Sequence, residues 1–98
     1  MAHSTPMTQQ AFETAMRAKG FTDFGVRDYA SATDAPDHAH EFSVEAMVVR
    51  GEMWLTVDGH TRHLRVGDTF ELDHAVVHAE RYGSEGATYW AARRYRGS

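Results

Sequence analysis

Beyond residue 20 the sequence is dominated by short runs in which apolar and polar residues alternate, and this period of two constrains the fold more than any other feature. Residues two apart on a β-strand face the same side, so a run such as EMWLTV (52–57) buries one face of a strand. Turn signals interrupt the runs: Asp58-Gly59 is a dipeptide typical of tight hairpins, and Gly67-Asp68 marks a further turn. These patterns predict an all-β domain with antiparallel strands.

The same pattern places the strands along the chain. We expect about seven, in a barrel or sandwich, over residues 23–30, 40–50, 52–57, 60–66, 69–72, 77–82 and 87–95. Residues 31–37 (SATDAPD) are expected to form a loop, Gly51 to end a strand, and GSEG (83–86) to form a loop before the last strand.

The first twenty residues have a different period and predict one amphipathic helix. Thr5-Pro6 fits its start, as an N-cap followed by proline at the first helical position, and Gly20 fits its end. Between them runs an apolar stripe at helical spacing, formed by Met7, Ala11, Phe12, Ala15 and Met16. Phe21 is placed to pack back on Met16, so we expect the helix to brace the barrel.

Length and composition limit the class of protein. Ninety-eight residues make one domain, 1–98, with the helix in 1–20 and the barrel in 21–96. A net charge of −4 argues against nucleic acid as a partner. No apolar run approaches the roughly 20 residues of a membrane helix, and the first residues lack the layout of a signal peptide. We therefore expect a cytoplasmic protein without a membrane partner.

The chain has seven histidines and no cysteine, so a transition metal would have to be held by imidazole and carboxylate groups. His38 and His40 lie two apart at the start of a predicted strand and share a face, as two ligands of one ion must. His60 and His63 follow a hairpin on a strand that we expect to be exposed. The histidines of interest are then His38, His40, His74 and His78.

Two motifs resemble those of the cupin superfamily. HAHEFSVEAMVVRG (38–51) resembles the first cupin motif, which has a His-x-His pair, an acidic residue some positions later and a final glycine. GDTFELDHAVVH (67–78) resembles the second, in which a third histidine follows eleven residues after the glycine. Fifteen residues separate Gly51 from Gly67, similar to the shortest spacer of the family. The resemblance implies a jelly-roll barrel, or double-stranded β-helix, with one N-terminal helix.

By this resemblance His38, His40 and His78 are metal ligands, and Glu45 supplies a carboxylate. The implied cofactor is one divalent transition metal ion, which could be Fe, Mn, Ni, Cu or Zn. The position of Glu45 leaves two alternatives open. A regular strand that faces inward at His40 also faces inward at Val44 and turns Glu45 outward, whereas a bulge after His40 would swing Glu45 to the histidine face.

Further polar residues lie near the third histidine. If His78 faces inward, Glu80 and Tyr82 share its face, and we expect these two to be catalytic and to move protons. The alternative for Glu80 is an outward position on an edge strand. His74 lies in the turn before His78, where we expect it at the rim, facing substrate or solvent. The family pattern has a glycine in this turn at the position of Ala75.

The resemblance implies a metal-dependent enzyme acting on a small oxygen-bearing or anionic metabolite, with dioxygenase (an oxidoreductase), isomerase and lyase chemistry all open. The alternative is a non-catalytic module that binds a metabolite or a metal, and a third possibility is a barrel that has lost its metal. Cupins commonly pair, and Trp54 and Trp90 are expected on outer faces. The resemblance thus implies a small-molecule ligand, and the outer tryptophans together with the pairing of cupins lead us to expect a homodimer.

Overall fold

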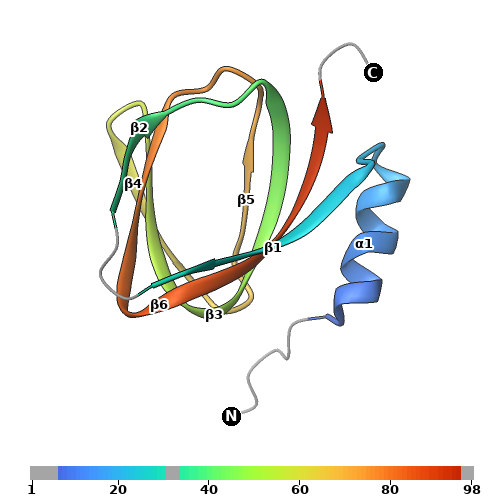
Figure 1. The fold of residues 1–98 in the computed structure, drawn as a ribbon, viewed down its shortest axis with the longest axis horizontal. Helices are drawn as coiled ribbons and strands as arrows, with labels where there is room; N and C mark the ends of the chain where they lie inside the picture. Colours follow the sequence, from blue (N-terminus) through green and yellow to red (C-terminus); the bar gives the residue numbers. More distant parts are fainter. Residues whose placement is uncertain (1–6, 31–33, 96–98) are drawn as a thin grey trace.

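The computed structural model describes residues 7–30 and 34–95, and the side chains of these residues except those of 34–38. Its elements, in chain order, are α1 (Gln9–Ala18), β1 (Asp23–Tyr29), β2 (Asp34–His38), β3 (Phe42–Val57), β4 (His60–Arg65), β5 (Thr69–Leu72) and β6 (His78–Tyr95). The strand pairings are antiparallel, and the strands form a barrel with the helix outside it (Figure 1). The expected all-β class with one N-terminal helix is confirmed.

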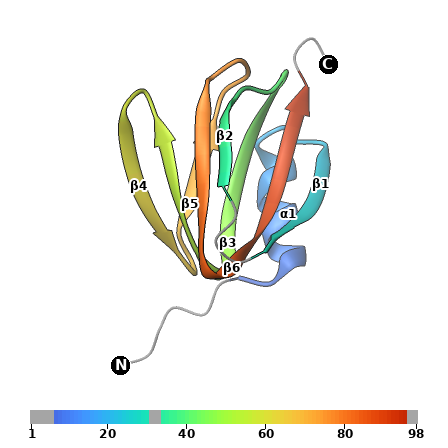
Figure 2. The ribbon, with the colours of Figure 1, turned by 60° about the vertical axis from the view of Figure 1, so that its left-hand side comes forward.

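The two long strands, β3 and β6, organise the barrel. They pair over nearly their whole lengths, from Phe42 opposite Tyr95 to Val57 opposite His78. The first half of β3 and the second half of β6 form one sheet with β1 and β5. The remaining halves form a second sheet with β2 and β4. Because both long strands pass from one sheet to the other, the sheets face each other across a shared interior (Figures 1 and 2).

Gly51 lies where β3 passes between the sheets. The pairing with β6 shifts register on both sides of it, between Val48 and Arg50 and between Gly51 and Met53, as at β-bulges. Gly51 has a φ of 72°, and a Cβ atom there would overlap the carbonyl oxygen of Gly86 on β6. The two backbones can therefore approach this closely only because position 51 has no side chain.

The strand boundaries differ from the expected ones in three places. Strand ends were expected at Gly51 and in 83–86, but β3 and β6 run through both segments. A bulge that contains glycine bends a strand without ending it, so the expected strands merge into fewer, longer ones. Conversely, residues 34–38 of the expected loop form β2, which pairs with the start of β6. Pro36 is compatible with this strand because, among the described strands, β2 pairs only with β6.

The turns predicted at Asp58-Gly59 and Gly67-Asp68 are confirmed. Asp58 and Gly59 connect β3 to β4 with φ values of 52° and 78°, the left-handed pair of a type I′ hairpin. In the turn formed by Gly67 and Asp68, the Asp68 carboxylate accepts a hydrogen bond of 2.8 Å from the backbone of Arg65. These turns set the positions of β4 and β5 against β3.

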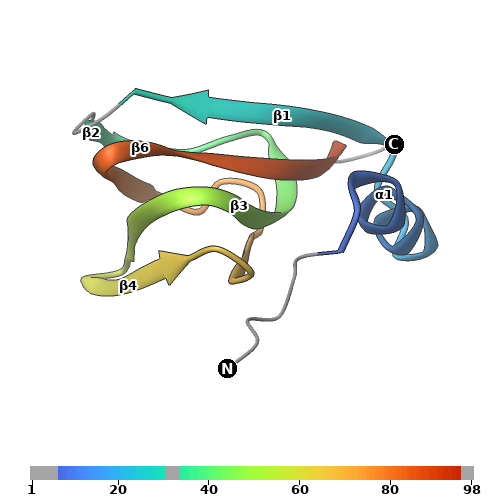
Figure 3. The same ribbon diagram turned by 90° about the horizontal axis from the view of Figure 1, so that it is seen from below.

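The helix α1 packs on the outer face of the first sheet (Figure 3). Its N-cap is Thr8, whose hydroxyl accepts from Ala11 N–H, while the expected start at Thr5-Pro6 lies outside the described residues. Its end is the predicted one, since Gly20 and Phe21 N–H both donate back into the last turn, as in a Schellman motif. In the part of the chain that the structure describes, no helix has the length and hydropathy to cross a membrane.

The buried apolar residues form two clusters, one on each side of the first sheet. The larger fills much of the barrel and consists of Val44, Ala46, Val48, Met53, Leu55, Leu64, Phe70, Leu72, Tyr82, Ala87, Tyr89 and Ala91. The smaller lies under α1 and consists of Phe12, Met16, Phe21, Met47 and Ala92. Trp90 packs against this second cluster, with its ring centroid 5.9 Å from that of Phe12. The helix therefore covers an outer face that would otherwise expose apolar side chains.

Candidate metal centre and ligand cavity

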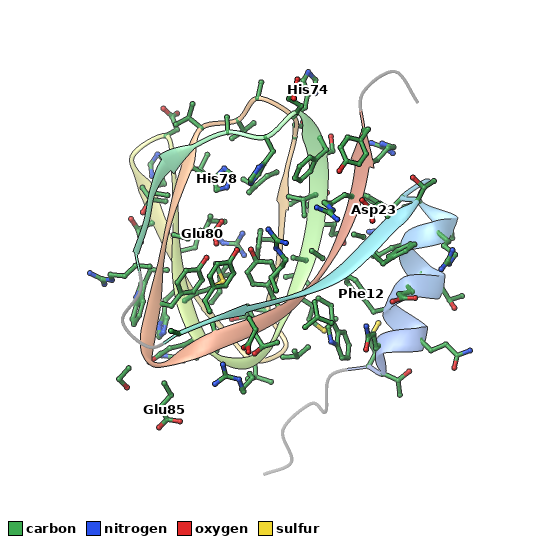
Figure 4. The ribbon with its side chains drawn as sticks, viewed as in Figure 1. Phe12, Asp23, His74, His78, Glu80 and Glu85 are labelled. Atoms are coloured by element: carbon green, nitrogen blue, oxygen red, sulfur yellow. The ribbon has the colours of Figure 1, made fainter. Side chains whose placement is uncertain are left out.

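A cavity of about 110 Å³ lies inside the barrel. Apolar side chains make up part of its wall, and its polar lining residues are Arg27, Tyr29, His40, His78, Glu80, Tyr89 and Arg93. Figure 4 shows His78 and Glu80 pointing from β6 into the interior. An apolar wall with a few convergent polar groups is typical of small-molecule sites.

His78 begins β6 and is buried, with 2% of its surface exposed. Its Nδ1 atom lies 3.0 Å from the carbonyl oxygen of Val76, which can only accept, so Nδ1 carries the hydrogen. Its Nε2 atom lies 3.3 Å from Oε2 of Glu80. Because Nδ1 is bonded to Val76, Nε2 is the nitrogen left to bind a metal, and in the protonated ring Nε2–H faces the Glu80 carboxylate.

Two opposing effects act on the pKa of His78. Burial lowers this pKa, but the hydrogen bonds to Glu80 and Val76 and the negative charge of Glu80 together outweigh burial, so the pKa is raised above its ordinary value of 6.5. The proton on Nε2 is therefore held more tightly than in a solvent-exposed histidine.

Glu80 lies within a cluster of tyrosines. Its Oε1 atom accepts hydrogen bonds from the hydroxyl of Tyr82 and, at 3.4 Å, from that of Tyr89. The Tyr29 hydroxyl lies 3.5 Å from that of Tyr89, and the rings of Tyr29 and Tyr82 stack with centroids 4.2 Å apart. Burial, together with the charge of Glu80, raises the pKa of Tyr82 and of Tyr89 far above 10. Both phenols therefore remain protonated and act as donors to the carboxylate.

His40 lies just before β3 and lines the same cavity. Its ring centroid is 5.1 Å from that of His78, and its ring stacks on Phe42 at 4.6 Å. The carbonyl oxygen of His40 accepts a hydrogen bond of 2.7 Å from Ala75 N–H, in the turn between β5 and β6. Ala75 has a φ of 65°, so alanine here adopts the left-handed conformation that the glycine of the family motif favours. This turn fixes His40 relative to the strand that carries His78.

His38 is the last residue of β2, and its backbone pairs with that of His78. Its side chain lies outside the described part of the structure. The fold thus brings position 38 beside position 78, while the assignment of His38 as a ligand stays a prediction.

Glu45 is not brought to the histidines. Pairing between β3 and β6 is regular from residue 42 to residue 48, so this part of the strand has no bulge, and Val44 faces the barrel interior while Glu45 faces the opposite side. There both of its carboxylate oxygens lie 3.1 Å from Nζ of Lys19, at the end of α1. Of the two alternatives for Glu45, the structure therefore has the outward one, which does not fit a metal ligand, and the carboxylate beside the histidines is that of Glu80.

Three other described histidines, His60, His63 and His74, do not line this cavity. His74 lies in the turn before β6, at the rim of the barrel as expected (Figure 4). His63 is on the outer side of the second sheet, where its ring stacks on Trp54 at 4.6 Å and its Nε2 lies 2.6 Å from Glu52. His63 is therefore remote from the cavity and suits a control substitution.

The chemistry of the cavity fits a divalent transition metal, because two imidazoles and a carboxylate line one space. Among the residues whose side chains are described, however, no group of three His, Asp or Glu residues is arranged to hold an ion. The convergence of His40, His78 and Glu80 thus provides donors of the right type without a completed ligand set in this structure.

The cavity also contains three residues that were not expected there, Arg27, Tyr29 and Tyr89. Arg27 and Tyr29 lie two apart on β1, and Arg27 is directly opposite Tyr89 in the register with β6. Alternation along β1 could have placed Arg27 and Tyr29 on one face. Nothing local shows that this face is the inner one, because that depends on pairing with a strand some sixty residues later.

The fold is thus a small antiparallel barrel that encloses a cavity. Residues 25–91 match the family model described as Cupin domain. The match covers more than half of the chain, so the chain belongs to the cupin family, and the resemblance of the two motifs is confirmed.

Solved structures with the same fold include several cupins. An RmlC-like cupin from Shewanella frigidimarina is 25% identical with a TM-score of 0.62, over 76% of this chain and 69% of that one. KdgF from Halomonas sp. is 20% identical with a TM-score of 0.63, over 74% and 69%. The DMSP lyase DddQ from Ruegeria pomeroyi is 21% identical with a TM-score of 0.69, over 76% of this chain but only 39% of that enzyme. A comparison with curated proteins finds no match.

Proposed function

We propose that this chain is a metal-binding cupin that acts as a metal-dependent enzyme on a small oxygen-bearing or anionic metabolite. The observation that carries the proposal is the convergence of the His40 and His78 imidazoles and the Glu80 carboxylate on one cavity. Burying such groups costs free energy, and titratable groups clustered in a buried cavity are typical of functional sites.

His38, His40 and His78 would hold the ion, with Glu80 as the nearest carboxylate. The bound metal (Fe, Mn, Ni, Cu or Zn) would supply a Lewis acid or, where it is redox-active, a centre that activates dioxygen. The hydrogen bond from Nδ1 of His78 to Val76 supports this role, because it leaves Nε2 as the coordinating nitrogen.

Glu80 and Tyr82 are the residues proposed to manage protons beside the metal. Oε2 of Glu80 faces His78 and is placed to accept a proton from a bound molecule, as isomerase and lyase reactions require. Tyr82 is 2% exposed and has a raised pKa, so it acts as a donor that positions Oε1 of Glu80 and not as a base. The structural neighbour described as a DMSP lyase supports only that this fold can carry lyase chemistry.

A non-catalytic binding module is the second candidate. One observation favours it: Glu80 is already contacted by Tyr82, Tyr89 and His78, so its buried charge is compensated by the protein itself. A barrel of this kind could bind a metabolite without turning it over.

Metal analysis tests the ligand assignment. Wild-type protein and the His40→Ala, His78→Ala and His63→Ala variants are reconstituted separately with Fe, Mn, Ni, Cu and Zn, dialysed and assayed for bound metal. We expect wild type and His63→Ala to retain the same ion, and the two cavity variants to lose it, because only their imidazoles line the cavity. Equal metal in all four proteins, or none in wild type, would show the assignment to be wrong.

Turnover separates the enzyme from the binding module. The metal-loaded protein is incubated with a panel of small acids and diketones, and both oxygen uptake and product formation by NMR are followed. Turnover that is lost in Glu80→Gln supports the enzyme. Tight ligand binding without turnover supports the module.

The proposal includes a homodimer. Trp90 is covered by α1, whereas Trp54 lies on the outer side of the second sheet, between His63 and the guanidinium of Arg81. The mass in solution, measured by light scattering, would show whether two chains associate.

A further inference from the structure

The inner face of β1 carries a cation that the metal centre does not use. Asp23, Gly25, Arg27 and Tyr29 alternate along this face, opposite Arg93, Ala91, Tyr89 and Ala87 of β6. Gly25, Arg27 and Tyr29 line the same cavity as His40, His78 and Glu80. Arg27 is also exposed, so it lies where the cavity meets solvent.

The two arginines of the cavity differ in their partners. Arg93 forms an ion pair with Asp23, with Nη2 and Oδ2 3.0 Å apart. Arg27 has no carboxylate partner within the described residues, and its neighbours are the hydroxyls of Tyr29 and Tyr89. The electrostatic interaction with Tyr29 contributes most to raising the pKa of Arg27, against partial burial. Arg27 is therefore a permanent positive charge at the cavity that no carboxylate among the described side chains neutralises.

The space beside Arg27 is open. The next inward pair along the two strands is Gly25 opposite Ala91, which are the two smallest kinds of residue. A Cβ atom added at Gly25 would have no heavy atom within 4 Å. A small ligand could therefore lie over Gly25 and Ala91 with one end at Arg27.

We propose that Arg27 binds the carboxylate of a small carboxylic acid whose remaining atoms lie over Gly25 and Ala91, in the cavity lined by His40 and His78. A guanidinium presents a planar pair of N–H donors that matches a carboxylate. One unneutralised positive charge also matches a monoanion better than a phosphate dianion, which would bring excess negative charge close to Glu80. This inference rests on the proposed function, because it takes the cavity to be the ligand site, and it specifies the class of ligand.

Calorimetric titration of the monoanions glycolate and pyruvate, each against its uncharged amide and against inorganic phosphate, tests the proposal. The proteins are wild type, Arg27→Gln, Arg27→Lys, Gly25→Val and the control Arg65→Gln, which removes a charge on β4 outside the cavity lining. All are studied both metal-free and after metal loading. We expect at least one acid to bind wild type more tightly than its amide does, and Arg27→Gln to weaken it by about 10- to 100-fold.

The variants distinguish charge from shape. Arg27→Lys is expected to restore part of the affinity, because it keeps the charge without the fork, and Gly25→Val to abolish binding by filling the space while leaving Arg27 in place. Arg65→Gln should match wild type. The proposal is overturned if no acid binds wild type better than its amide, if phosphate binds more tightly than the acids, or if Arg27→Gln stays within about twofold of wild type.

Metal content, measured in the same samples, separates the two hypotheses. If Arg27→Gln retains metal and loses the acid, both stand. Wild type that binds the acid through Arg27 but holds no metal contradicts the metal centre alone. Metal binding with acid affinity unchanged by Arg27→Gln contradicts the carboxylate site alone.

Discussion

Replacing Gly51 with alanine should destabilise the barrel far more than the same change at Gly59. Both glycines have left-handed backbones, with φ values of 72° and 78°, so both alanines pay the same conformational cost of about 1–2 kcal/mol. The smaller entropy of the unfolded alanine chain offsets about 0.4–1 kcal/mol of it in each case. At Gly59 a new Cβ would meet nothing within 4 Å, so we expect a net loss of about 0–1.5 kcal/mol there.

At Gly51 a steric term adds to this loss. The new Cβ would overlap the carbonyl oxygen of Gly86 and lie 3.0 Å from Cα of Ala87, and both are backbone atoms of β6 that cannot rotate away. Overpacking of this kind costs about 1–3 kcal/mol more. The free energy of unfolding of Gly51→Ala should therefore be about 1–3 kcal/mol lower than that of Gly59→Ala. This difference corresponds to a melting temperature lower by roughly 5–20 °C for a domain of this size.

Urea unfolding followed by tryptophan fluorescence gives the free energies of unfolding of wild type and the two variants. Circular dichroism melts provide the second measurement. If the two variants lose the same free energy within about 0.5 kcal/mol, the close approach of β3 and β6 at this bend does not limit stability, and the reasoning fails.

Three further predictions concern the site. Because the pKa of His78 is raised, metal affinity should fall as the pH drops through a value above 6.5. In the metal-free protein, the stabilisation from the His78–Glu80 pair should be present at low pH and lost as the pH rises through that same value. An NMR titration of metal-free His78 with a midpoint at or below 6.5 would contradict both expectations. Tyr82→Phe keeps the stacked ring but removes a donor to a buried carboxylate, so urea unfolding should show a loss of about 1–3 kcal/mol, and unchanged stability would argue against this hydrogen bond. Glu45→Gln breaks an ion pair with half-exposed Lys19 outside the barrel, so the free energy of unfolding should fall by less than about 1 kcal/mol. The metal content should be unchanged. Loss of metal from this variant would restore Glu45 as a ligand.

Local signals in the sequence were sufficient for the turns and for the class of fold. Asp58-Gly59 and Gly20 have chemistry that specifies their backbone conformation almost without regard to the rest of the chain, and both predictions are confirmed. Gly51 was misread because a glycine in a strand pattern marks a strand end or a bulge equally well. Only pairing with β6 decides between them, and that pairing joins residues far apart in the sequence.

In the site, too, some residues could be placed from the sequence, and others depended on long-range strand pairing. The spacing of the two motifs was enough to expect His40 and His78 together, and their rings lie 5.1 Å apart. The face of Glu45 depended on whether a bulge preceded it, which the sequence left open and the regular pairing of β3 resolves. Arg27 could not be found, because its significance lies in the absence of a described acidic neighbour, which is a property of packing and not of spacing.

The pairing of β6 with β1, β2 and β3 has a consequence for how the protein is made. Among the described strands β1 and β2 pair only with β6, and β3, which also pairs with β4 and β5, needs β6 along its other edge, so these edges stay unpaired until β6 has been synthesised. Closure then depends on contacts between distant segments, which form slowly. A metal ion or an acid ligand would meet its binding groups only after that last step, so loading should follow folding and not guide it.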